Sequence, residues 1–193
     1  MNEPNNGSLV SESGVALASV LPRLRQDKVV TTTNPDTGCA QVDALLDCSA
    51  SSIFAVLTDF ENLPDHIYGL EEAFVHVQQG NRASVRYRMK LPFPLGRVAW
   101  TNVVTTSQRD DGTHCLEWVL VEGDLSQCRG RIQLSPIGEN GNQTFARYEI
   151  HVEHKNRLPK KAQQLAIRWL MPKVIVRLCK RLEANAKEQA SAA

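Results

Sequence analysis

The chain has 193 residues, of which 42% are hydrophobic and 22% are charged, and its formal net charge is +1. A chain of this length can bury a core without disulfides or metal ions, and the near-neutral charge excludes a global attraction to nucleic acid or to an acidic membrane. The charge is divided along the chain, because residues 1–156 carry a net −6 and residues 157–193 carry a net +7. We therefore predict an acidic body followed by a basic final segment.

The cysteines and the N-terminus bear on where the protein resides. The chain has five cysteines, an odd number, and no C-x-x-C pair, which argues against a disulfide framework and indicates a reducing compartment. The N-terminal residues lack the basic and apolar regions of a signal peptide, and no apolar run approaches the roughly 20 residues of a membrane span. These features predict a soluble, cytoplasmic protein.

Residues 1–13 are polar and rich in Gly, Asn and Ser, which predicts a disordered tail. A single domain is expected over residues 14–188, followed by a short C-terminal tail over residues 189–193. The first elements of the domain are predicted to be a helix and the two strands of a hairpin, at residues 15–25, 28–33 and 39–48.

The first clear helix lies in the segment SASSIFAVLTDFENLP, residues 49–64. Apolar residues recur along it at spacings of three and four, which predicts one buried helical face. These residues are Ile53, Val56, Leu57 and Phe60. Ser49 or Ser51 is expected to cap the N-terminus, and the Leu63–Pro64 pair is expected to end the helix and begin a second short one.

Six further strands are separated by turn signals at regular intervals. Their predicted ranges are residues 70–78, 82–91, 97–107, 113–122, 125–134 and 143–153. Apolar and polar residues alternate along many of them, so one face of the sheet is expected to be apolar and the other to meet water. The short links between consecutive strands predict an antiparallel meander.

The chain ends in a long predicted helix, about residues 159–188, with an apolar stripe at spacings of three and four. Pro172 is expected to kink this helix, because proline removes one backbone donor and clashes with the preceding turn. The fold class is therefore α+β, with a curved antiparallel sheet wrapped around the long C-terminal helix and two short helices after the first long strand. A strongly curved sheet does not close completely on one helix, so we expect a cavity between them.

Three segments together resemble a known family. The segment SASSIFAVLTDFENLP, a later EGDL followed by RGRIQLSP, and the proline-kinked terminal helix resemble the START-like (SRPBCC) superfamily, and within it the polyketide cyclase/dehydrase and coenzyme Q-binding group. The matching segments are residues 49–70, 118–136 and 159–184. The resemblance implies the helix-grip fold and a deep apolar pocket for lipids, isoprenoid quinones, or sterol-like or polyketide molecules. The family often carries Trp where this chain has Ile132, which indicates a different pocket shape.

Large side chains on the predicted inward phase of the strands are candidates for the wall of this pocket. The candidate ligand-binding residues are Tyr87, Met89, Trp100, Asn102, Leu116, Trp118, Ile132, Tyr148, Ile150 and Trp169. Ordinary core packing is the alternative for any single one of them, because aromatic residues dominate protein cores.

Candidates for catalysis are few. His114 shares the strand phase of Leu116 and is the one candidate general base, with a satisfied buried polar group as the alternative. Asp59 and Glu61 resemble a carboxylate pair, but we expect them to end the first helix outside the cavity. The histidines lack metal-binding spacing, and the chain contains no nucleophile elbow, dinucleotide fingerprint or phosphate loop, so neither a metal nor a cofactor is predicted.

These features favour the binding, transport or chaperoning of a hydrophobic small molecule, either a lipid, an isoprenoid quinone or a polyketide-like molecule. A cyclase or dehydratase acting on a polyketide-like substrate is the first alternative, and a ribosome- or membrane-associating protein is the second. The apolar loop from Leu91 to Gly96 and the basic terminal helix are candidate membrane contacts, with solvent-facing charges as the simpler account of the helix. No DNA partner is predicted.

Overall fold

The computed structural model describes residues 20–24, 29–34, 39–91, 96–138, 140–155 and 181, and every structural statement concerns these residues. Residues 20–24 are helical, in agreement with the first predicted helix. The predictions for the two tails, the tip of the loop from Leu91 to Gly96, the kinked terminal helix and Trp169 lie outside the described residues.

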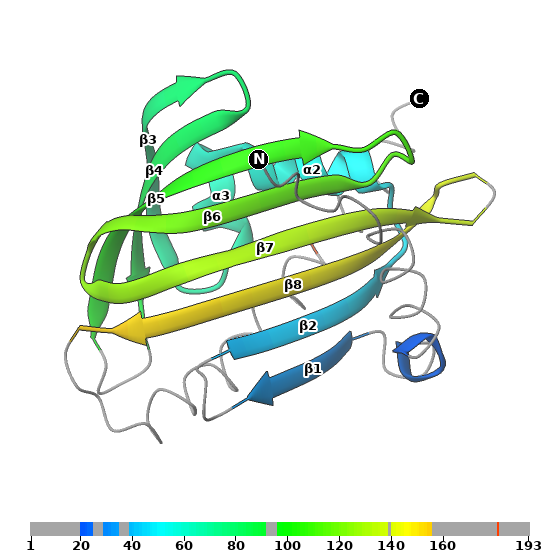
Figure 1. Cartoon of the computed structure of the whole chain (residues 1–193), viewed down its shortest axis with the longest axis horizontal. Coiled ribbons are helices and arrows are strands. Elements are labelled where there is room, and N and C mark those ends of the chain that lie inside the picture. The colour runs from blue at the N-terminus through cyan, green and yellow to red at the C-terminus, as the bar shows by residue number, and fades with distance from the viewer. Residues whose placement is uncertain are drawn as a thin grey trace, which may run out of the picture.

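One curved antiparallel sheet of eight strands forms the body of the described structure (Figure 1). The strands are β1 (Val29–Asn34), β2 (Cys39–Leu46), β3 (Leu70–Gln79), β4 (Arg82–Lys90), β5 (Arg97–Gln108), β6 (His114–Gly123), β7 (Leu125–Ile137) and β8 (Gln143–His154). Their order in the sheet is β1-β2-β8-β7-β6-β5-β4-β3. The predicted hairpin and meander are confirmed, and the pairing of β2 with β8 joins them into one sheet.

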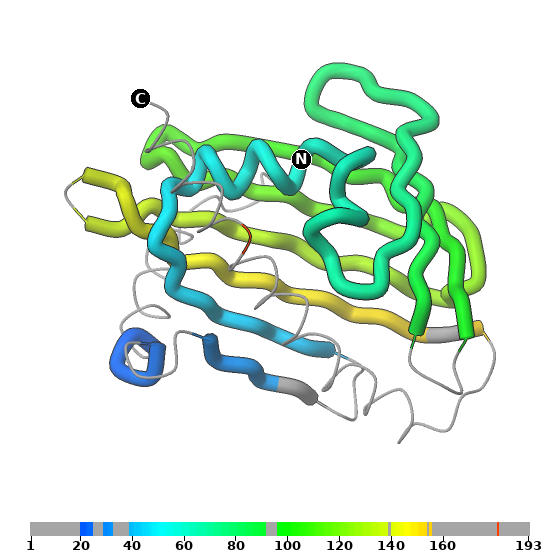
Figure 2. Tube along the Cα trace, turned by 180° about the vertical axis from the view of Figure 1, so that it is seen from behind, coloured from blue at the N-terminus to red at the C-terminus, as the bar shows by residue number. Residues whose placement is uncertain are grey.

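Three short helical segments follow β2 and lie on one face of the sheet (Figure 2). They are α2 (Ala50–Thr58), the 3-10 turn η1 (Phe60–Asn62) and α3 (Leu63–His66). The Ser49 hydroxyl caps α2 by accepting a hydrogen bond from the Ser52 amide at 3.2 Å, and Pro64 lies in the first turn of α3. The predicted helix pair is therefore confirmed, with Ser49 as the cap.

The main core lies on this inner face, between the sheet and the helices. Ile53 and Leu57 of α2 pack with inward residues of the strands, among them Val42, Val85 and Leu134, all of which are buried. Successive strand residues point to opposite faces, so one phase of each strand supplies the core. The predicted buried face of α2 is confirmed, because Ile53, Leu57 and Phe60 are buried and Val56 packs against the core.

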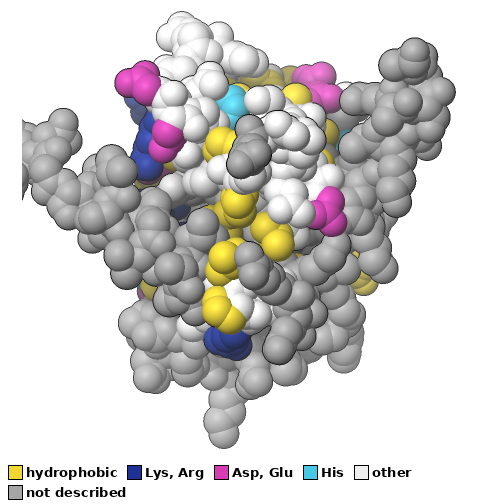
Figure 3. All heavy atoms as spheres, turned by 90° about the vertical axis from the view of Figure 1, so that its right-hand side faces the viewer, with side chains coloured by type: hydrophobic (Ala, Val, Ile, Leu, Met, Phe, Trp, Pro, Cys, Tyr) yellow, Lys and Arg dark blue, Asp and Glu magenta, His cyan; other side chains and the backbone are white. Residues whose placement is uncertain are grey.

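Part of the outer face of the sheet is buried. The expectation that this whole face is exposed to solvent is therefore wrong at one end of the sheet. Leu24, Val30 and Phe145 form a second buried cluster on it, where the helical residues 20–24 cover the β1–β2–β8 end of the sheet. Figure 3 views the molecule from the right-hand side of Figure 1, where hydrophobic side chains form a band through the described surface and charged side chains lie near its margins. Alternation of apolar and polar residues predicts solvent exposure here, and the prediction fails because residues 20–24 cover these strands.

Candidate functional site: a cavity on the inner face

A cavity of about 150 Å³ lies between the inner face of the sheet and the short helices. Nine of the ten predicted ligand-binding residues line it, and the tenth, Trp169, lies outside the described residues. These nine are Tyr87, Met89, Trp100, Asn102, Leu116, Trp118, Ile132, Tyr148 and Ile150. Strand alternation brings them together, because each lies on the inward phase of β4, β5, β6, β7 or β8.

Sequence reasoning missed seven further lining residues. They are Leu57, Phe60, Leu63, Ile67, Leu70, Val104 and Cys128. Val104 and Cys128 share the inward phase of the predicted residues Asn102 and Ile132 on their own strands, so the phase was the available signal for these two. Leu57 and Phe60 were predicted to be buried, but the spacing of apolar residues along a helix does not distinguish a cavity wall from a solid core.

The DFENLP segment, residues 59–64, has a structural role at the cavity. Asp59 is the C-cap of α2, and its carboxylate accepts a hydrogen bond from the Asn62 side chain at 2.9 Å. This tight turn brings the side chains of Phe60, at the start of η1, and Leu63, at the start of α3, into the cavity lining. Asp59 and Glu61 are exposed and do not line the cavity, in agreement with the prediction.

The RGR segment lets the aromatic side chains of the wall meet. Trp118 of β6 pairs with Gly130 of β7, and its ring reaches Tyr148 of β8 with a centroid separation of 5.5 Å. A Cβ atom at Gly130 would clash with the Trp118 ring and with the Glu149 carbonyl. Glycine is therefore required here, because the indole lies across the strand at this position.

The GDL segment fixes the turn between β6 and β7 to β5. The Asp124 carboxylate accepts a hydrogen bond from the Ala99 amide at 2.7 Å, and the Asp124 amide donates to the Ala99 carbonyl at 2.8 Å. Gly123 has φ +124° and lies so close to Ala99 and Trp100 that a side chain would clash. This segment therefore positions Trp100 at the cavity and does not itself enter it.

Two polar atoms in the cavity wall lack partners within the described part of the chain. The Asn102 side chain is buried, and its Nδ2 donates to the Cys128 thiol at 3.8 Å, whereas its Oδ1 accepts no hydrogen bond. The indole Nε1 of Trp100 is also buried without an acceptor. Buried polar atoms in proteins are nearly always paired, so these two require an explanation.

The titratable groups of the described lining are two tyrosines and one cysteine. Burial raises the pKa of Tyr87 and of Tyr148 far above the ordinary value of a phenol. Burial also raises the pKa of the Cys128 thiol. All three groups are therefore neutral at physiological pH, and the described lining contains no carboxylate, imidazole or amine.

His114, the predicted candidate base, is not among the residues that line the cavity. It lies at the start of β6 beneath α2, where its ring stacks on Phe54 with a centroid separation of 4.5 Å. Its Nε2 is 3.3 Å from the Ser51 hydroxyl, and its Nδ1 is buried without a described partner. His114 does point to the inner face of the sheet, as its strand position predicts. It does not reach the cavity, because α2 covers this end of β6.

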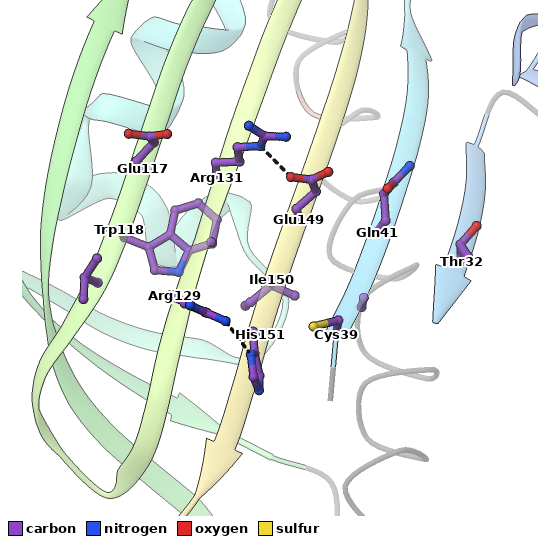
Figure 4. A pocket seen from close by; sticks show the side chains of 13 residues that line it. Thr32, Cys39, Gln41, Glu117, Trp118, Arg129, Arg131, Glu149, Ile150 and His151 are labelled. Atoms are coloured by element: carbon purple, nitrogen blue, oxygen red, sulfur yellow. Dashed lines mark hydrogen bonds and ion pairs between the residues drawn. The ribbon is translucent and has the colours of Figure 1, made fainter. Parts of the chain in front are cut away.

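A larger hollow, of about 670 Å³, lies on the outer face of the sheet (Figure 4). Two pairs of its side chains interact across the strands, Arg131 with Glu149 and Arg129 with His151. Because these four side chains already interact with one another, they have fewer hydrogen-bonding groups left for a ligand. The smaller inner cavity, with its apolar wall and unpaired polar atoms, is the better candidate site.

The described residues contain neither a metal-binding cluster nor a membrane-spanning helix. No group of three or more His, Cys, Asp or Glu side chains is placed to hold a metal ion among them. None of the described helices has the length and apolar character needed to cross a bilayer.

Comparisons with known proteins agree with this geometry. A family model described as polyketide cyclase / dehydrase and lipid transport matches residues 46–179. No curated protein matches the chain by sequence. The family description covers both lipid transport and cyclase chemistry, so it does not decide between binding and catalysis.

Solved structures show the same fold at low sequence identity. A STAR-related lipid transfer protein from Xanthomonas axonopodis has a TM-score of 0.68 at 13% identity, over 80% of this chain and 92% of that one. Human STARD10 has a TM-score of 0.67 at 14% identity, over 99% of this chain and 84% of that one. The Zhui aromatase/cyclase from Streptomyces sp. R1128 has a TM-score of 0.61 at 9% identity, over 84% of this chain and 96% of that one. The fold is thus START-like, and the family match shows that the chain belongs to the polyketide cyclase/dehydrase and lipid transport family.

Proposed function

We propose that this protein binds an apolar small molecule in the inner cavity and carries or shelters it from water. The observation that supports this function best is an apolar and aromatic wall with no charged side chain among the described lining residues. Lipids, isoprenoid quinones and polyketide-like molecules are the ligand classes that fit.

The size of the cavity limits how much of the ligand it holds in this conformation. A volume of about 150 Å³ is comparable to that of engineered protein cavities that bind benzene. The described cavity therefore accommodates one ring or a short branched chain. We infer that a longer lipid places only one end in this cavity.

Cyclase or dehydratase activity is the second candidate, favoured by the family description. Such chemistry needs an acid or base near the reacting carbon. The described lining offers only Tyr87, Tyr148 and Cys128, whose raised pKa values make them poor proton donors at neutral pH. Turnover of a poly-β-ketone analogue by the purified protein tests this candidate, and a rate above background would favour it over simple binding.

The binding proposal is tested with a benzene-sized probe that is visible by NMR. We expect the ¹⁹F signal of 4-fluorotoluene to broaden and shift on addition of the protein. Ile132→Trp places a larger side chain in the cavity and should weaken binding by about tenfold or more, since it occupies the space of the probe.

Val119→Trp is the matched control, because Val119 lies on the outer face of β6 and is 62% exposed. It adds the same indole without entering the cavity, so binding should be unchanged. Absence of binding to the native protein, or equal weakening by both substitutions, would contradict the proposal.

A further inference from the structure

Two tyrosines of the cavity wall carry hydroxyl groups that bear on how a ligand enters. Tyr87 of β4 and Tyr148 of β8 both line the cavity. Within the described part of the chain neither hydroxyl makes a hydrogen bond, and neither is among the unpaired atoms that the protein encloses completely. Trp100 Nε1 and Asn102 Oδ1 are enclosed in that way, so the two phenols, and not those two atoms, are open to a ligand.

The two hydroxyls lie in the interior and within electrostatic range of each other. Burial raises the pKa of both phenols, and the nearby Cys128 thiol of β7 raises both further. Tyr87 also raises the pKa of Tyr148, although β5, β6 and β7 lie between their strands in the curved sheet (Figure 1). A hydroxyl that is accessible at this depth faces the cavity and not bulk water.

Each phenol ring packs on a tryptophan of the same wall. The Tyr87 ring lies on Trp100 with a centroid separation of 5.5 Å, and the Tyr148 ring lies on Trp118 at the same separation. These contacts hold both rings in place. The cavity therefore presents two positioned O–H donors on a wall that is otherwise apolar.

We propose that the ligand enters this cavity with an uncharged end that carries an oxygen, such as the carbonyl of a ketone, an ester or a quinone, and that this oxygen accepts a hydrogen bond from Tyr87 or Tyr148. An alcohol oxygen accepts in the same way and belongs to the same class. This inference rests on the proposed function, because it specifies which end of an apolar ligand occupies the cavity.

Other ligand ends match the two phenols less well. A hydrocarbon end displaces water from the cavity and leaves both hydroxyls without a partner, which is unfavourable for buried polar groups. A carboxylate or phosphate end would bring a charge into a cavity whose described lining contains no cation. An uncharged acceptor oxygen pairs with a phenol and introduces no buried charge.

The test compares 4-fluorobenzaldehyde with 4-fluorostyrene by ¹⁹F NMR titration at neutral pH. The two probes have nearly the same planar shape and differ in a carbonyl oxygen against a methylene group. Tyr87→Phe and Tyr148→Phe each remove one hydroxyl and keep the ring on its tryptophan. At least one of them should weaken binding of the aldehyde about fivefold, as expected for one lost hydrogen bond between uncharged groups, while binding of 4-fluorostyrene is unchanged or tighter.

Tyr68→Phe is the matched control, because Tyr68 is 38% exposed and does not line the cavity. It should leave the binding of both probes unchanged. The two cavity variants are tested separately, so one of them keeps the test decisive if the other does not fold.

The hydroxyl groups are not the recognition elements if neither cavity variant changes the ratio of the two dissociation constants, or if the aldehyde does not bind to a native protein that binds 4-fluorotoluene. Either result would overturn this inference and leave the proposed function standing. A water molecule that keeps its place on the two hydroxyls would give the first of these results. Failure of the native protein to bind all three probes would overturn the proposed function itself.

Discussion

The inner and outer faces of this sheet are built from the same strands but satisfy their polar groups in opposite ways. On β8, Tyr148 and Ile150 face the cavity, whereas Arg147 and Glu149 between and beside them face outward. On the outer face Arg147 pairs with Asp43 and Arg131 pairs with Glu149, whereas on the inner face Asn102 Oδ1 has no described partner. The difference shows that the two faces of one strand satisfy their polar groups to different degrees.

The outer face contains a buried ion pair between Arg147 and Asp43. Arg147 Nε donates to Asp43 Oδ1 at 2.7 Å, Arg147 also reaches Oδ2 at 3.2 Å, and Gln41 donates to the same carboxylate at 2.8 Å. The Asp43 side chain is 4% exposed and that of Arg147 is 16% exposed. A carboxylate so placed depends on its partner, because removal of the cation leaves a buried charge.

The largest expected effect therefore falls on the outer face. Arg147→Ala should lower the free energy of unfolding by about 3–5 kcal/mol, since Asp43 loses its cation. Arg131→Ala is the control, because the Arg131–Glu149 pair is partly exposed, at 47% and 33%, and should cost less than about 1 kcal/mol. Urea unfolding measures both; equal losses would show that burial does not set the strength of these pairs.

On the inner face the most sensitive position is Gly130. Gly130→Ala should lower the free energy of unfolding by about 3 kcal/mol, because the new methyl group clashes with the Trp118 ring and the Glu149 backbone. Gly80→Ala is the control: Gly80 has φ +57° and nothing within 4 Å of an added Cβ, so only about 1 kcal/mol of backbone strain is expected. A cost at Gly130 no larger than that at Gly80 would contradict the close packing of Trp118 across β7.

The buried tyrosines of the inner face should make the protein sensitive to base. A raised pKa means that the unfolded chain releases these protons first, so stability is constant at neutral pH and falls once the pH exceeds the ordinary phenol value near 10. Each tyrosine should then contribute a slope of about 1.4 kcal/mol per pH unit. Tyr148→Phe should reduce the slope measured by urea unfolding between neutral pH and pH 11 (roughly one unit above that value), and an unchanged slope would show that Tyr148 is not the responsible group.

Local patterns in the sequence predict most of this fold, because the strands, the turns and the α2 cap depend on nearby residues. Alternation also places Tyr87, Trp100 and Trp118 on the wall of the cavity. Pairings between distant segments are not encoded in local periodicity: the sequence alone gives no sign that Arg147 reaches Asp43 or that α2 covers His114. The unpaired state of Asn102 likewise depends on what surrounds it in space.

The most direct test of the central claim is a methyl NMR titration of the full chain with 4-fluorotoluene. The methyl signals of Leu116 and Ile132, which line the cavity, should shift in proportion to the bound fraction. Those of Val119 and Val121, which are exposed on the outer face of the same sheet, should stay in place. Shifts confined to Val119 and Val121, or no shifts at all, would contradict a ligand site on the inner face.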